Sequence, residues 1–141
     1  MLLPCDEVVI IDHGSQDGTQ DLAREYGAQV LSARQGDPAQ KALHGLRDAP
    51  SRWFLVVDPR ESLTESLAAS LYEWKSEVRA EGSTRGGSVY LREETAAGWI
   101  QVPAPQTRLV PGTWQRWRGA LPENDQRAVV LEGELLRFVF P

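Results

Sequence analysis

Three short apolar segments alternate with helix-like segments in the first half of the chain, and this alternation restricts the fold more than any other feature. The apolar segments are residues 7–12 (EVVIID), 28–33 (AQVLSA) and 52–58 (RWFLVVD). Short, uniformly apolar runs rich in β-branched residues are typical of strands covered on both faces, as in parallel sheets. The sequence therefore predicts an α/β fold that begins with parallel strands.

Helix signals follow each of the first two strands. Residues 18–27 end in a Gly that can cap the last turn, and Ser15 or Asp17 could cap the first turn. Residues 37–49 open with Asp-Pro, which suits an N-cap followed by the first helical position. We expect a helix in each connection.

The third predicted helix has the clearest pattern. Residues 62–65 (SLTE) fit a capping box, which places the helix start at Ser62. An apolar stripe with steps of four and three then follows. Its members are Leu63, Leu67, Leu71, Trp74 and Val78. We expect this stripe to pack on the core.

The composition changes after the loop at residues 80–88. Residues 88–94 and 98–102 predict a hairpin across the turn TAAG, and the remaining sequence is rich in strand formers. Further short strands are expected at residues 107–110, 113–119, 127–133 and 135–140. We interpret residues 1–141 as one domain with a βαβαβα part at 1–82 and a β-rich part at 83–141.

The overall composition excludes several classes of protein. A net charge of −5 argues against non-specific binding to nucleic acid, which needs clustered Lys and Arg. Cys5 is the single cysteine, so an internal disulfide is excluded. No apolar run approaches the roughly 20 residues that span a bilayer. We therefore expect a cytoplasmic protein without a transmembrane segment.

Two of the three predicted strands end in an acid, Asp12 and Asp58. Ligands of open α/β sheets bind outside the carboxyl ends of the strands, so this edge is the expected site. Asp58 and Glu61, three residues apart, could hold a divalent cation through their carboxylate oxygens. The alternative is that the acids at these strand ends cap turns.

Three segments, in this order, resemble the family 2 glycosyltransferases, which have the GT-A fold. They are residues 6–30 (DEVVIIDHGSQDGTQDLAREYGAQV), 52–71 (RWFLVVDPRESLTESLAASL) and 107–123 (TRLVPGTWQRWRGALPE). The first matches an apolar strand that ends in Asp before a Gly-Ser-x-Asp-Gly-Thr turn. The second resembles the strand and Asp-x-Asp region, and the third resembles the Arg-Leu-Phe strand and a later His-Glu. The resemblance implies a three-layer GT-A sheet with a β-rich C-terminal half.

The resemblance also implies roles for individual residues. The nucleotide of a nucleotide-sugar donor would lie beside the first strand end and its turn, at Asp12, His13, Ser15 and Asp17. Asp58 and Glu61 would hold a Mn²⁺ or Mg²⁺ that neutralises the diphosphate. Glu123 is the candidate base for the acceptor hydroxyl. His13 is otherwise an exposed turn residue.

This sequence departs from the family pattern at the residues that carry the chemistry. The second acid of Asp-x-Asp is Arg60, which cannot ligate a metal but could pair with a diphosphate directly. The His of His-Glu is Pro122, and an Arg-Asn pair expected in the second helix is Ala42-Leu43. These changes indicate a degenerate active site.

The family's first strand has no counterpart here, because residues 7–12 match its second strand. In the GT-A sheet the first strand is central, and without it two strand edges would be exposed. We expect residues 135–140, or a strand from a second copy in a homodimer, to fill this place.

Two tryptophans, Trp114 and Trp117, alternate with Arg116 and Arg118. They could form a surface that stacks on a sugar or acceptor, or they could pack on the core as alternate residues of a strand.

Two functions remain open at this point. The first is a glycosyltransferase-like protein that transfers sugar from a nucleotide-diphosphate donor, or binds the donor with reduced or lost activity. The second is a non-catalytic interaction or regulatory module that keeps the fold. The retained Asp12 turn favours the first, whereas Arg60 and the absent strand favour the second.

Overall fold

The computed structural model describes residues 9–12, 29–32, 42–43, 46, 52–81 and 85–140. Within these ranges the chain is rich in β-structure, with one long helix, α3 (Glu65–Glu81). The strands are β1 (Val9–Asp12), β2 (Gln29–Ser32), β3 (Trp53–Leu55), β4 (Glu61–Leu63), β5 (Gly87–Thr95), β6 (Gly98–Gln101), β7 (Gln106–Pro111), β8 (Trp117–Arg118), β9 (Leu121–Pro122) and β10 (Val129–Arg137).

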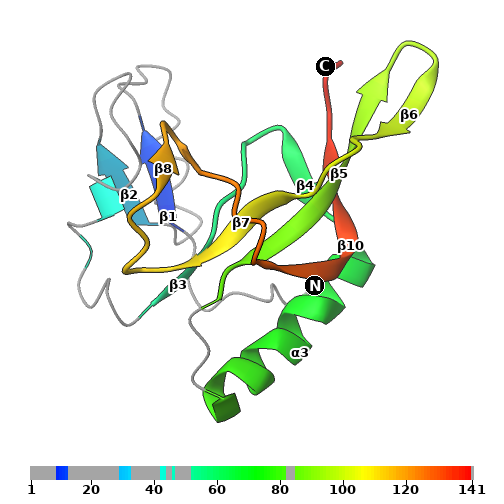
Figure 1. Ribbon diagram of the computed structural model, residues 1–141. Helices are drawn as coiled ribbons and strands as arrows, with labels where there is room; N and C mark the ends of the chain where they lie inside the picture. The colour runs from blue at the N-terminus through cyan, green and yellow to red at the C-terminus, as the bar shows by residue number, and fades with distance from the viewer. Residues whose placement is uncertain are drawn as a thin grey trace.

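Strands β1 and β2 form a parallel pair in which Asp12 lies opposite Ser32 (Figure 1). The predicted parallel pairing is therefore confirmed for the first two strands, but it is wrong for the third, because β3 pairs antiparallel with β7 in a separate sheet. The helix expected at 18–27 lies outside the described residues. Of the helix expected at 37–49, Ala42, Leu43 and Leu46 are described; Ala42 and Leu43 are helical, and Leu46 lies in a bend.

The main sheet has six strands, ordered β3-β7-β5-β10-β4, with β6 paired to β5 alone. All its pairings are antiparallel except β5 with β10, which is parallel. In the described part of the chain, β3 bonds to β7 and makes no ladder with β1 or β2. The fold class is thus α/β and sheet-rich.

The last strand, β10, lies between β5 and β4 (Figure 1). The expectation that residues 135–140 take the place of the family's first strand is wrong, because Leu135–Arg137 pair with β4 on one side and β5 on the other. Residues 127–133 and 135–140 were also expected as two strands. They share β10, whose register with β5 shifts between Val130 and Glu134.

The described members of the predicted apolar stripe pack on the main sheet. The side chain of Val78, the last member of the stripe, lies outside the described part of the chain. Leu67 and Leu71 are buried together with residues of β5, β7 and β10. Trp74 packs against the same cluster and meets Trp53 of β3 edge to face, with ring centroids 4.7 Å apart. The helix therefore covers the sheet through the residues that the 3.6-residue period selects.

The start of α3 differs from the prediction. Ser62 lies in β4, opposite Leu136, and is not a cap. The N-cap is Thr64, whose Oγ1 accepts a hydrogen bond of 3.2 Å from Leu67 N. The same hydroxyl donates to Glu134 O at 2.8 Å, so the cap also joins α3 to β10. Because Ser62 pairs with β10, the N-cap of α3 lies two residues later than the sequence predicts.

A second buried cluster lies apart from the first, around Leu43 and Leu46. Val9, Ile11 and Leu31 pack against it, together with Phe54 and Trp117. Ala42-Leu43 stands where the family has a polar pair, and Leu43 is indeed a core residue, 7% exposed. Within β3, Phe54 faces this cluster while its neighbours Trp53 and Leu55 face the first.

The predicted hairpin at residues 88–102 is confirmed by the pairing of β5 with β6. Thr95 lies opposite Gly98 at the turn, and Gly98 has a φ of 121°, which favours glycine. Figure 1 shows this hairpin projecting from the sheet. The strand expected at 113–119 is reduced to β8, which pairs with β9.

Candidate functional site

The connection from β3 to β4 contains Asp58, and Glu61 begins β4; these are the two acids that the sequence predicts as metal ligands. Glu61 N donates to Asp58 O at 2.9 Å, which closes a turn over residues 58–61. Asp58 N donates in return to the Glu61 carboxylate, at 2.7 Å from Oε1. Although the sequence predicted a strand up to Asp58, β3 ends at Leu55, so Asp58 lies in the turn itself.

Asp58 and Arg60 form an exposed pair within this turn. The Asp58 Oδ1 atom accepts hydrogen bonds from Arg60 N at 2.9 Å and from Arg60 Nε at 3.2 Å. The Arg60 side chain is 58% exposed. Partial burial alone would raise the pKa of Asp58, but the Arg60 hydrogen bonds and the charges of Arg60 and Arg137 outweigh it and lower that pKa. Asp58 is therefore ionised at neutral pH.

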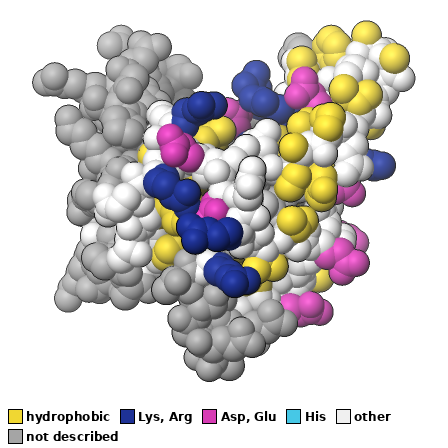
Figure 2. Space-filling view, in the orientation of Figure 1, with side chains coloured by type: hydrophobic (Ala, Val, Ile, Leu, Met, Phe, Trp, Pro, Cys, Tyr) yellow, Lys and Arg dark blue, Asp and Glu magenta, His cyan; other side chains and the backbone are white. Residues whose placement is uncertain are grey.

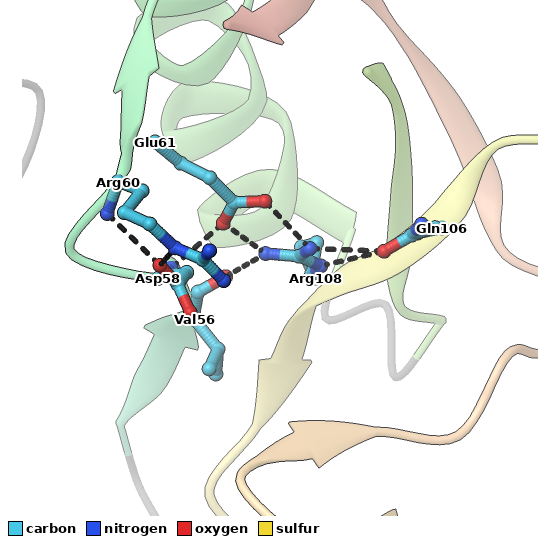
Figure 3. A network of polar contacts seen from close by, with 6 residues as sticks. All are labelled: Val56, Asp58, Arg60, Glu61, Gln106 and Arg108. Carbon is cyan, nitrogen blue, oxygen red and sulfur yellow. Dashed lines mark hydrogen bonds and ion pairs between the residues drawn. The ribbon is translucent and has the colours of Figure 1, made fainter. Parts of the chain in front are cut away.

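Glu61 points the other way, into the protein, where it meets Arg108 of β7 (Figure 3). Arg108 Nη1 lies 2.6 Å from Glu61 Oε1, and Nη2 lies 2.9 Å from Oε2. The two side chains are 2% and 0% exposed. This is a buried, bidentate ion pair, the arrangement in which an Arg and a carboxylate bind most strongly.

These contacts do not fit a divalent cation. Both oxygens of Glu61 are engaged by Arg108, and Asp58 Oδ1 is engaged by Arg60. A cation beside Asp58 would also meet the positive charge of Arg60. Among the described residues, no group of three or more His, Cys, Asp or Glu side chains could hold a metal ion. A metal role for Glu61 would require Arg108 to release its carboxylate.

Glu123, the candidate base, follows β9 at the surface. Its N–H donates to Arg116 O at 2.9 Å, and its side chain is exposed. The next residues dock on β7, because Asn124 Oδ1 accepts from Thr107 N at 3.0 Å and Asp125 N donates to Thr107 Oγ1 at 2.8 Å. Thr107 and Arg108 are neighbours, so one strand holds both the Glu123 segment and the Asp58 turn.

The two tryptophans of this region have different environments. Trp117 packs on the second cluster, as expected of a core residue, and its Nε1 donates to Trp114 O. Trp114 is also half-buried, and the Arg116 guanidinium lies 4.6 Å from its ring centroid. Arg116 also pairs with Asp125 at 2.6 Å. Arg116 therefore lies over one face of the Trp114 ring, on which a sugar could otherwise stack.

The nucleotide-binding residues predicted around the first strand are described in part. Asp12 is the last residue of β1, at the carboxyl end of the parallel pair. His13, Ser15 and Asp17 lie outside the described residues. Their roles stay predictions.

Comparison with known proteins identifies the family. The sequence model of glycosyl transferase family 2 matches residues 3–78, more than half of the chain. The chain belongs to glycosyl transferase family 2. The matched range includes residues 6–30 and 52–71, the first two segments that resemble the family, and it ends before residues 107–123.

One relative of this family 2 chain is a TPR repeat-containing protein of Synechococcus elongatus. The two are 34% identical over 99 residues, which is 70% of this chain and 23% of the relative. The chain thus corresponds to less than a quarter of that protein's length.

Arg108 and Gln106 are site residues to which sequence reasoning gave no role. The available signal was an Arg within an apolar strand, residues 107–110, because a buried Arg requires an acid or several acceptors. Which acid it meets could not be read from the sequence, since Glu61 is 47 residues away. As to membranes, the described residues contain no helix both long enough and apolar enough to span a bilayer.

Proposed function

We propose that this family 2 chain is a glycosyltransferase-like protein that binds a nucleotide-sugar at the carboxyl ends of β1 and β3, in a GT-A arrangement. The observation that carries the proposal is the family match over residues 3–78, because it spans both Asp12, at the end of β1, and Asp58, in the turn that follows β3. The exposed, ionised turn at Asp58 supports it further, since a group that serves a ligand must be reachable from solvent.

In this proposal Arg60 takes over the charge role of the metal. A guanidinium can bind phosphate oxygens through two parallel hydrogen bonds. The contact with Asp58 uses Nε of Arg60, so it does not occupy the donors of the terminal Nη groups. Asp58 then serves to orient Arg60 toward the donor diphosphate. Binding would be independent of Mn²⁺ and Mg²⁺.

Sugar transfer would need a base in addition. Glu123 is the candidate, and its segment is held on the same strand as the Asp58 turn. In the reaction, Glu123 would accept the proton of an acceptor hydroxyl as its oxygen bonds to the sugar carbon. The bond from that carbon to the diphosphate would break, and the nucleoside diphosphate would leave with the electron pair.

A second function is favoured by a separate observation, an exposed apolar patch on β6 and the segment after β10 (Figure 2). Its members are Trp99, Ile100, Phe138, Val139 and Phe140, which are 41–55% exposed. Apolar groups gathered in this way often mark interaction surfaces. A non-catalytic module that binds a partner would keep this patch and need no donor site.

The two functions are separated by a thermal-shift titration with UDP, GDP and their common sugars, each with and without Mn²⁺. Ligand at about 100 times its dissociation constant stabilises the fold by about 2.7 kcal/mol. We expect a rise in melting temperature that does not need Mn²⁺ and is lost in Arg60→Ala. Arg127→Ala, which removes an 85% exposed Arg elsewhere, is the matched control.

The other outcomes are equally informative. A shift that requires Mn²⁺ would contradict the role given to Arg60 and restore the metal to Asp58. If no nucleotide shifts the melting temperature at millimolar concentration, the glycosyltransferase-like function is wrong and the interaction module stands.

A further inference from the structure

One buried guanidinium holds both ends of the turn that carries Asp58 and Arg60. Arg108 Nη1 donates to Val56 O, before the turn, at 3.1 Å. The same guanidinium binds both oxygens of Glu61, at the end of the turn (Figure 3). Residues 56 and 61 are therefore fixed relative to each other by a side chain from β7.

Every donor of Arg108 is used in this network. An arginine side chain has five N–H bonds. Three of them go to Val56 and Glu61, and the other two go to Gln106 Oε1, from Nε at 3.3 Å and from Nη2 at 2.9 Å. Gln106 thus fixes the plane of the guanidinium. A lysine, with three donors at one atom, could not reproduce this set.

The hydrogen bonds continue from Arg108 to the exposed residues. Glu61 Oε1 accepts from Asp58 N, and Asp58 Oδ1 accepts from Arg60 N and Nε. The conformation of the backbone at Asp58 decides where its carboxylate points, and that carboxylate holds the Arg60 side chain. The chain of contacts therefore runs from a fully buried residue to the proposed ligand-binding pair.

We infer that Arg108 is a positioning residue of the candidate site: through Glu61 it sets the conformation of residues 56–61 and so the direction in which Asp58 and Arg60 face. The ligand part of this inference rests on the proposed function. The conformational part does not, because it concerns hydrogen bonds within the protein.

The competing explanation is that the buried pair only stabilises the fold. A double variant, Arg108→Met with Glu61→Met, separates the two, because replacing a buried ion pair by apolar residues of similar volume often leaves stability unchanged. Two amides report on the turn through hydrogen bonds that involve neither altered side chain. These are the amide of Arg60, which donates to Asp58 Oδ1, and the amide at position 61, which donates to Asp58 O.

We expect the double variant to unfold cooperatively while these two amides exchange with solvent about fivefold faster or more, the effect of one lost hydrogen bond. Amides of β5 should be unchanged. Nucleotide affinity should fall by about tenfold or more, because displaced groups bind their ligand poorly. Arg92→Met, which removes the ion pair of Arg92, a side chain 52% exposed, with Glu134, is the matched control.

The inference is overturned if the double variant folds and both amides and the nucleotide affinity match those of the parent chain. Should the double variant not fold, Glu61→Gln and Arg108→Lys keep the volume and give the same readout. If the Arg60 amide exchanges at the parent rate in both single variants, the inference is also overturned. A parent chain that binds no nucleotide would remove the proposed function, while amide exchange would still decide the positioning role.

Discussion

Gly133 lies where β10 comes closest to the start of α3. A Cβ at this position would be 2.6 Å from Leu67 Cα, and the φ of 99° already disfavours any side chain. We expect Gly133→Ala to lower the free energy of unfolding by about 3 kcal/mol or more, from backbone strain and overpacking together. Urea denaturation measures this loss.

Gly119→Ala is the matched control. Gly119 also has a positive φ, 60°, but nothing lies within 4 Å of a Cβ there. The substitution should cost about 1 kcal/mol, from the backbone alone. Equal losses in the two variants would show that α3 does not press on Gly133.

Asp125 makes the stability of the protein depend on pH. The hydrogen bond from Arg127 N, followed by that from Arg116, lowers the pKa of its carboxyl group below the ordinary value. A lowered pKa means that the ionised form stabilises the fold at pH values above about 4 and that this contribution disappears as the pH falls through the folded-state value. Asp125→Asn should therefore lower the urea midpoint at pH 7 and leave it near that of the parent chain at pH 2.

Glu123→Gln removes an exposed carboxylate two residues away and is the control for this measurement. A difference between Asp125→Asn and the parent chain that persists at pH 2 would mean that the charge of Asp125 is not the cause.

At the scale of elements, Thr64 joins α3 to β10. Its hydroxyl accepts from Leu67 N and donates to Glu134 O, so one side chain caps the helix and bonds to the neighbouring strand. Thr64→Ala should destabilise the protein by about 2 kcal/mol, since it removes a cap and a half-buried hydrogen bond. Thermal or urea unfolding measures the change.

Two further variants test the position of the cap. Thr64→Ser keeps the hydroxyl and should recover most of the stability. Ser62→Ala alters the residue that the capping-box pattern indicates, and because Ser62 is exposed in β4 it should change stability by less than about 0.5 kcal/mol. A larger effect at Ser62 than at Thr64 would contradict the observed helix start.

At the scale of the whole molecule, β3 connects two apolar clusters. Phe54 packs on the cluster around Leu43, whereas Leu55 packs on the cluster of the main sheet. Phe54→Ala should speed amide exchange in β1 more than in β5, because each cluster protects the strands packed on it. Leu55→Ala, one residue away, should give the reverse order. Equal changes in both strands for both variants would show that the clusters open together.

How much of the structure the sequence could predict depends on how far apart in the chain the interacting residues lie. Apolar period and turn chemistry are local, and they indicated the parallel strands β1 and β2, the β5–β6 hairpin and the stripe of α3. The start of α3 was misplaced because Ser62 is a strand residue through its pairing with β10. That pairing joins residues more than 70 positions apart, which no local pattern contains.

The sequence by itself determined the α/β class, the family and the presence of Asp58 and Arg60 shortly after an apolar strand, since each depends on residues close together in the chain. Only the tertiary structure decided that Glu61 faces inward to Arg108 while Asp58 faces outward to Arg60. The physical reason is that a buried charge is stable only beside its partner, and the partner of Glu61 comes from β7. Glu61, which the sequence predicted as a metal ligand, therefore stabilises the turn through Arg108.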